Sequence, residues 1–272
     1  VGDAIEFLRI HGKSSRWFLY LHLMDLHEYT YDEESALFGN SVSDLYDNSI
    51  LRTDWMISQL YEFMTERGLL ENTIIVVLSD HGEAFGERGF EGHARAVFPE
   101  TTGTPLIISL PFSLASGLVI EDQTANVDVW PTLLELLGLP TQSESDGISR
   151  RDEILAALAG DSSPVRESEL SVAFLDENWG RPGTDWKPAI SVAEGSHRYI
   201  SGRDHAGRPF EVLLSTEVDD AVDQSKEFPE VTLRLRKRAA EALREKAVWK
   251  PETFDLDEMQ LDQLRALGYE LP

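Results

Sequence analysis

The chain has 272 residues and carries 24 basic against 49 acidic side chains, a formal net charge of −25. This charge excludes nucleic acid as an expected partner, because binding nucleic acid requires a basic surface. No residue is a cysteine, so disulfides, zinc–thiolate sites and a cysteine nucleophile are excluded for this segment. No apolar run approaches the ~18 residues of a membrane span. An acidic, lysine-poor surface fits a high-salt environment, although an ordinary acidic bacterial protein fits equally well.

The first elements predict an alternation of strands and helices. Residues 17–24 (WFLYLHLM) are almost entirely apolar, which predicts a strand buried on both faces, as in a parallel sheet. An acidic loop over residues 25–41 follows and contains His27. Apolar residues three and four positions apart then predict a helix over residues 42–67, with Gly68 just after its end.

A second buried strand is predicted over residues 73–78 (TIIVVL), and Asp80 and His81 follow at its carboxyl end. The next loop is rich in glycine and charge and contains His93. The elements expected after it are a strand over 105–110, a helix over 127–137 with Pro131 in its first turn, and a helix over 149–160 with a capping box of Ser149 and Asp152.

After residue 170 the pattern changes to short apolar runs separated by turns, which predicts a small antiparallel sheet. Its strands are expected over 171–175, 189–193, 197–200 and 210–214, and helices over 229–248 and 257–267 end the chain. The sequence therefore predicts two parts. Residues 1–165 form an α/β catalytic domain, and residues 166–272 form a small sheet with helices.

Polar residues follow two of the predicted strands. Ligands of open α/β sheets bind beyond the carboxyl ends of the strands, where His27 and the pair Asp80 and His81 are expected. A carboxylate with an imidazole suits Zn, Mn or Fe, and the carboxylate also suits Ca or Mg. Gly82 allows a sharp turn or close approach of a substrate. The structural alternative is that Asp80 caps a helix and His81 is an ordinary loop histidine.

The segment 73–87 (TIIVVLSDHGEAFGE) resembles the sulfatase branch of the alkaline phosphatase superfamily. Residues 18–28 resemble the family strand that ends in a substrate-site histidine. Further resemblances are found over 92–108 with the loop and next strand, over 127–134 with the start of a helix, and over 264–269 with a C-terminal ending of bacterial members. These ordered matches cover most of residues 16–140 and the tail.

The resemblance implies an alkaline-phosphatase-like α/β fold, with a mostly parallel sheet flanked by helices. It implies that Asp80 and His81 bind a divalent metal ion. The resemblance favours Ca²⁺, with Mg²⁺, Mn²⁺ or Zn²⁺ as alternatives. His27 and His93 would contact the sulfate or phosphate group, or protonate the leaving oxygen. Glu83 would at most support them. The implied activity is hydrolysis of a small-molecule or carbohydrate sulfate ester.

The family also carries two acidic metal ligands and a nucleophile that precede the first strand, and this chain has no counterpart before residue 17. We therefore expect the C-terminal part of an enzyme, binding metal weakly and inactive alone. Periplasmic, secreted and membrane-anchored forms all fit. Residues 162–166 (SSPVR) match the family pattern S-x-P-x-R, but they follow Asp80 instead of preceding it and are interpreted as a turn.

Two rival functions remain. One is a phosphodiesterase, phosphonate monoester hydrolase or phosphotransferase of the same superfamily. An unmodified threonine nucleophile would favour this rival, whereas a modified cysteine or serine would favour a sulfatase. The other is a non-catalytic binding module derived from the enzyme, which predicts that no metal is bound.

Overall fold

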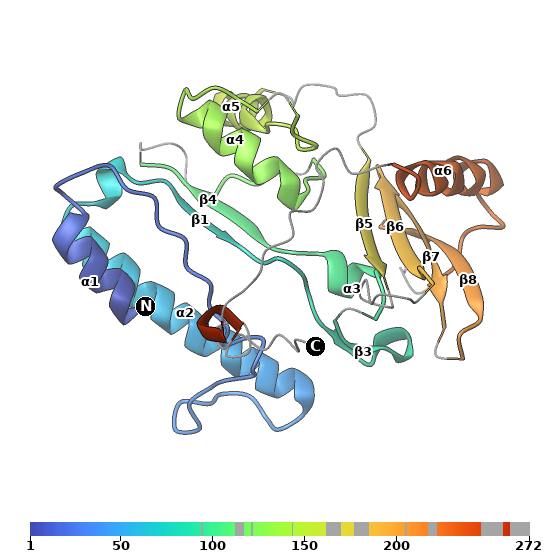
Figure 1. Cartoon of the computed structure of the whole chain (residues 1–272), viewed down its shortest axis with the longest axis horizontal. Helices are drawn as coiled ribbons and strands as arrows, with labels where there is room; N and C mark the ends of the chain where they lie inside the picture. Colours follow the sequence, from blue (N-terminus) through green and yellow to red (C-terminus); the bar gives the residue numbers. More distant parts are fainter. Residues whose placement is uncertain are drawn as a thin grey trace. The chain divides into compact units, whose positions relative to one another are not determined.

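The structure is a computed structural model (Figure 1). It describes residues 1–93, 95–111, 117–120, 122–142, 144–161, 170–176, 185–204, 206–216, 222–245 and 258–261. The chain divides into two compact units. The first comprises residues 1–74 and 246–272, and the second comprises residues 75–245. The domain boundary expected near residue 165 stays a prediction.

Two helices dominate the described part of the first unit, α1 over Gly2–His11 and α2 over Val42–Glu66. The Ser41 hydroxyl accepts the Asp44 backbone N–H at 3.2 Å, and the Asp44 carboxylate accepts the Ser41 N–H at 2.9 Å. The hydrogen bond from the Ser41 side chain is the main cause that lowers the pKa of Asp44. The predicted helix is confirmed, and Gly68 follows it with φ of 62°.

The strand predicted over residues 17–24 is wrong for the structure as described. These residues pair with no other strand among the described residues. The side chains of Phe18 and Tyr20 are each 72% exposed. A strand requires a neighbouring backbone to satisfy its N–H and C=O groups. Apolar composition shows that a segment favours burial, but it does not supply that neighbour.

The second unit begins with two small sheets. β1 (Ile75–Leu78) pairs antiparallel with β4 (Leu106–Ser109), which confirms both predicted strands. β2 (Ala84–Phe85) pairs antiparallel with β3 (Glu91–Gly92). Every strand pairing among the described residues is antiparallel, so the mostly parallel sheet is not found there. Burial on both faces, the basis of that expectation, is absent too, because alternate side chains of β4 are exposed.

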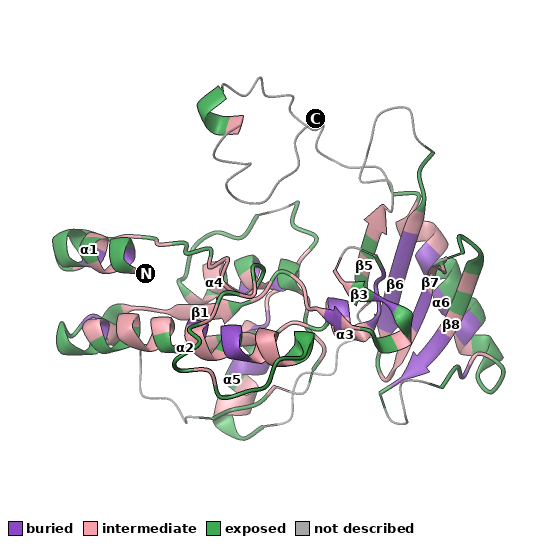
Figure 2. Cartoon of the chain, turned by 90° about the horizontal axis from the view of Figure 1, so that it is seen from below, coloured by how far each residue is buried: buried purple, intermediate pink, exposed green. Residues whose placement is uncertain are grey.

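A four-stranded antiparallel sheet forms the other half of this unit, in the order β5-β6-β7-β8. All four predicted strands are confirmed, with bounds Ser171–Asp176, Pro188–Glu194, His197–Arg203 and Pro209–Ser215. The helix α6 (Pro229–Ala242) begins where predicted and covers one face of the sheet. Leu235 and Ala239 of α6 pack there against Ile190 and Leu213. The buried residues of β6, β7 and β8 are visible in Figure 2.

The opposite face of the four-stranded sheet contacts residues on both sides of β3. Phe90 and Phe98 pack against Ile200 of β7, and the Phe98 ring stacks on Phe210 with centroids 5.7 Å apart. The helix α3 (Pro99–Thr102) starts directly after this contact. The loop that carries His93 is therefore fixed to the sheet at both of its ends.

Arg198 of β7 ties α3 to the sheet. Its guanidinium donates to the hydroxyls of Thr102, at 2.9 Å, and Ser191, at 3.1 Å. Burial lowers the pKa of Arg198, although an arginine stays protonated in proteins.

The remaining helices pack around a buried ion pair. The 3-10 turn η3 (Asn126–Asp128) leads into α4 (Val129–Leu136), and α5 spans Arg151–Ala159. The Arg150 guanidinium donates to the Asp128 carboxylate at 2.6 and 2.9 Å, and both side chains are buried. The capping box predicted at Ser149 is wrong. The Ser149 hydroxyl accepts the N–H two residues on, at 3.3 Å, and α5 has no side-chain cap.

The last predicted helix spans residues 257–267 and lies mostly outside the described residues. Its only described part, residues 258–261, is helical. Two 3-10 turns complete the described elements, η1 (Leu70–Asn72) and η2 (Glu87–Gly89). Among the described helices, none combines the length and apolarity needed to cross a membrane.

The ion pair at Asp128 yields a test of stability. Changing Arg150→Ala leaves the carboxylate buried without this cation, which we expect to lower the free energy of unfolding by about 3–5 kcal/mol. The matched control is Arg151→Ala, because Arg151 and its partner Asp152 are 43% and 63% exposed. The control should cost about 0–1 kcal/mol. Urea denaturation measures both, and equal effects would contradict the assignment.

Candidate metal and anion site

Asp80 and His81 leave the carboxyl end of β1 as predicted, and local hydrogen bonds orient both side chains. The Asp80 Oδ1 accepts the backbone N–H of His81 at 3.0 Å. The His81 Nδ1 lies 2.8 Å from the Gly82 carbonyl oxygen. A carbonyl oxygen can only accept, so Nδ1 must carry the proton and Nε2 holds the lone pair in the neutral ring. This is the arrangement that a metal-binding histidine needs.

The separation of the two ligand atoms is compatible with one shared ion. Asp80 Oδ1 lies 3.9 Å from His81 Nε2. With metal–ligand bonds of ~2.0–2.2 Å, two ligand atoms of one ion can be at most ~4.4 Å apart. The Asp80 side chain is 75% exposed, so its second oxygen is accessible. The pair therefore fits a divalent cation and would supply two of its ligands.

The turn after β1 is fixed from two directions. The Asn126 side-chain amide donates to the carbonyl oxygens of Ser79, at 2.9 Å, and Asp80, at 3.2 Å. The Gly82 N–H donates to the Thr101 carbonyl oxygen at 2.9 Å. Asn126 is not among the residues that the sequence predicts for this site. It lies 46 positions beyond Asp80 and belongs to no spacing pattern that would have revealed the contact.

Gly82 passes directly over the backbone of α3. A Cβ atom at this position would lie 2.2 Å from the Glu100 carbonyl oxygen and 3.1 Å from that of Gly103. Both atoms belong to the backbone and cannot move as a flexible side chain would. The missing side chain at Gly82 therefore makes room for the protein's own main chain, and the close approach of a substrate stays a prediction.

His93 lies beside His81. The two imidazole rings stack with centroids 4.3 Å apart and an interplanar angle of 26°. The His93 Nδ1 lies 2.9 Å from Glu83 Oε2. The ligand atoms of His81, Glu83 and His93 all lie within 4.8 Å of one another. Glu83, expected only to support the histidines, is therefore a central member of the cluster.

His27 lies in the first unit, whereas the other three predicted residues lie in the second. Its Nδ1 is 3.0 Å from Glu28 Oε1, and both side chains are partly exposed. The loop that carries it is tied to α2, because Arg52 Nε donates to Asp25 Oδ1 at 3.1 Å. The structure thus brings together Asp80, His81 and His93 within the second unit, whereas His27 belongs to the first.

The model of the Sulfatase family matches residues 2–139, which is half of the chain. The chain belongs to the sulfatase family. It is 27% identical to the steryl-sulfatase of Rattus norvegicus over 200 residues, which cover 68% of this sulfatase chain and 33% of that protein. The chain therefore spans about a third of the length of this relative.

Solved structures show the same fold. One, a complex with its substrate D-glucosamine-2-N,6-O-disulfate, has a TM-score of 0.57 at 21% identity and covers 80% of this sulfatase chain and 44% of its own. Another is the phosphonate monoester hydrolase of Agrobacterium radiobacter, with a TM-score of 0.54 at 18% identity and coverages of 74% and 41%. These likenesses confirm the predicted alkaline-phosphatase-like α/β fold.

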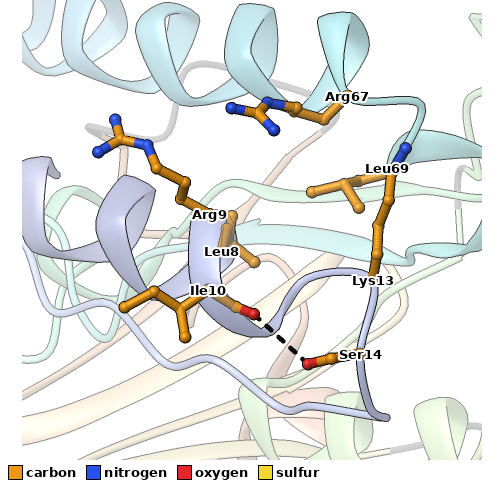
Figure 3. A pocket seen from close by; sticks show the side chains of 7 residues that line it. All are labelled: Leu8, Arg9, Ile10, Lys13, Ser14, Arg67 and Leu69. Atoms are coloured by element: carbon orange, nitrogen blue, oxygen red, sulfur yellow. Dashed lines mark hydrogen bonds between the residues drawn. The ribbon is translucent and has the colours of Figure 1, made fainter.

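A pocket of about 220 Å³ opens between α1 and the end of α2, and none of the predicted site residues lines it (Figure 3). Its lining residues are Leu8, Arg9, Ile10, Lys13, Ser14, Arg67 and Leu69. The S-x-P-x-R match at residues 162–166 and the family-like ending at 264–269 both lie outside the described residues.

The close approach at Gly82 can be tested by Gly82→Ala in this sulfatase chain. The added methyl group must displace the turn or α3, which we expect to cost about 1–3 kcal/mol of unfolding free energy and to shift the ring resonances of His81 and His93. Gly2→Ala is the control, because a Cβ at Gly2 meets nothing within 4 Å. Wild-type stability in Gly82→Ala would contradict the packing described here.

Proposed function

We propose that this chain carries part of the active site of a metal-dependent enzyme that hydrolyses sulfate esters. One observation carries the proposal. The rings of His81, beside Asp80, and of His93, from the β2–β3 hairpin, stack at 4.3 Å. The pair of Asp80 and His81, which can bind a cation, therefore lies beside His93, which can exchange protons. Membership of the sulfatase family supports this reading.

Asp80 and His81 are the proposed metal ligands, through Oδ1 and Nε2. A bound divalent ion would neutralise charge on the sulfate group and lower the pKa of the nucleophile. Family custom favours Ca²⁺, whereas an imidazole ligand suits Mn²⁺ or Zn²⁺ better and Mg²⁺ remains compatible with the carboxylate. The cluster of His81, Glu83 and His93 is the rival ligand set.

His93 is the proposed proton donor. As the sulfur–oxygen ester bond breaks, the Nε2–H bond of the doubly protonated His93 ring breaks and an O–H bond forms on the released alcohol, so that the leaving group departs uncharged and the ring becomes neutral. His27 is proposed, from the family resemblance alone, for contact with the sulfate group or for the same proton transfer. The nucleophile and the two acidic ligands of the family are proposed to lie outside residues 1–272.

The proposed substrate is a sulfate ester of a small molecule or carbohydrate. The steryl-sulfatase and the protein in complex with the glucosamine disulfate are named for unlike alcohols that share only the sulfate group. The net charge of −25 does not oppose an anionic substrate. Surface carboxylates are largely screened beyond ~8 Å at physiological salt, and a bound cation would set the local field.

Phosphonate or phosphate ester hydrolysis is the second candidate, favoured by the structural likeness to a phosphonate monoester hydrolase. Both groups present a tetrahedral anion to the same side chains. Turnover of 4-nitrophenyl sulfate against 4-nitrophenyl phenylphosphonate by the active enzyme separates the two. Mass spectrometry of the nucleophile gives an independent answer, because a modified cysteine or serine indicates a sulfatase.

The metal assignment predicts that Asp80→Ala lowers the affinity of the 272-residue chain for Mn²⁺ or Ca²⁺ at least tenfold, because it removes one of two ligands. Isothermal titration calorimetry measures this affinity. Asp152→Ala is the control, since Asp152 is an exposed carboxylate of the same unit. If Glu83→Gln weakens binding while Asp80→Ala does not, the rival cluster is the metal site. Absence of metal from the active enzyme by elemental analysis would favour a non-catalytic module.

The proton-donor role predicts that His93→Ala lowers kcat of the active enzyme by about 10²–10⁴-fold. The effect should shrink for substrates with strongly acidic leaving groups, which need no proton. His11→Ala is the control, because His11 ends α1 at the surface of the other unit. Unchanged turnover of a poor leaving group in His93→Ala would refute the role.

A further inference from the structure

We propose that Glu83 is the positioning residue for His93 and that it fixes the imidazole as the tautomer protonated on Nδ1. This inference rests on the proposed function for its catalytic consequence, but the tautomer itself does not depend on any activity. The observation behind it is the contact of 2.9 Å between Glu83 Oε2 and His93 Nδ1, formed by a carboxylate whose side chain is only 9% exposed.

The hairpin places these two residues opposite one another. β2 and β3 pair Ala84 with Gly92 and Phe85 with Glu91. One step further along the same antiparallel register brings Glu83 opposite His93. Directly opposed side chains on one face of an antiparallel pair lie ~4.5–5.5 Å apart at Cβ, close enough for a hydrogen bond between long side chains. The contact is therefore built into the strand pairing and does not depend on a chance side-chain conformation.

Burial gives the Glu83 carboxylate a strong requirement for a donor. Removing a carboxylate from water is costly unless it is hydrogen-bonded or paired with a charge. An ionised carboxylate can only accept, so the shared proton of a neutral His93 must lie on Nδ1. Nε2 is then the nitrogen that exchanges a proton with substrate. The face of the ring is restrained as well, because His81 stacks on it at 4.3 Å.

The consequence for the reaction is geometric. When the ester bond breaks, the doubly protonated His93 ring gives its Nε2 proton to the alcohol oxygen, and the neutral ring that results keeps its Nδ1 proton between itself and Glu83. Without Glu83, a neutral imidazole in water prefers the proton on Nε2, and the ring is free to turn about its side-chain bonds. A donor that is held in one orientation loses less of its effect to wrong geometries.

Nitrogen NMR of the 272-residue chain tests the tautomer. With ¹⁵N-labelled histidine at a pH where the ring is neutral, we expect His93 to show a protonated Nδ1 and a bare Nε2. Glu83→Ala should shift this toward the Nε2-protonated form. Glu83→Gln should retain the wild-type tautomer, because the amide oxygen still accepts. Glu91→Ala, an exposed carboxylate of the same hairpin, should change nothing. A bare Nδ1 in the wild-type chain would overturn the proposal.

Kinetics and metal affinity separate positioning from metal ligation. In the active enzyme, Glu83→Ala should lower kcat about tenfold to 100-fold with little change in KM, and Glu83→Gln should recover most of the loss. The affinity of the 272-residue chain for Mn²⁺ should stay within about threefold of wild type in both variants. A tenfold loss of affinity would instead make Glu83 a metal ligand and overturn the proposal. A correct tautomer with no sulfate or phosphonate turnover would refute the proposed function alone.

Discussion

The packing of Phe90 and Phe98 against the four-stranded sheet is the contact on which the candidate site depends. These aromatic side chains bury both ends of the loop that carries His93 in one hydrophobic cluster with β6, β7 and β8. The chain then enters α3. Gly82 packs against the backbone of α3 and donates its N–H to the Thr101 carbonyl oxygen, which fixes the turn after β1. One packed cluster therefore determines where both His81 and His93 lie. The small C-terminal sheet, which contributes none of the proposed site residues, is what holds them together.

The same part of the molecule shows how an acidic chain uses its few cations. Only 24 basic residues oppose 49 acidic ones, yet Arg150 is buried against a carboxylate, and the half-buried Arg198 donates to two hydroxyls. Arginine suits such positions, because its planar guanidinium donates several fixed hydrogen bonds and stays charged. Other carboxylates, such as those of Asp80 and Asp152, are exposed, and water and salt screen their repulsion there. The large net negative charge of the chain therefore does not prevent specific arginine contacts in its interior.

The sequence predicted those elements whose signal is local. The apolar stripe of α2, the β-branched run of β1 and the turn-separated strands β5 to β8 each contain their own pattern, and all are found. The strand prediction for residues 17–24 was wrong because a strand requires a hydrogen-bonding partner strand, and an apolar run does not show which segment that partner is. At the candidate site, motif order singled out Asp80, His81 and His93, and the structure brings these three residues together. Asn126 was missed because it reaches the turn across 46 positions of sequence.

The two stacked histidines show why one kind of site residue is easier to predict than the other. His81 directs its Nδ1 to the carbonyl of the next residue, at 2.8 Å, so its orientation is set within the dipeptide that the motif preserves. His93 directs its Nδ1 to a carboxylate ten positions away, which only the register of a two-residue ladder brings opposite it. A change in the register of the hairpin would therefore leave the Nδ1 contact of His81 in place and remove that of His93. The ring orientation of His81 is set by its own turn, whereas that of His93 requires the strand pairing of β2 and β3.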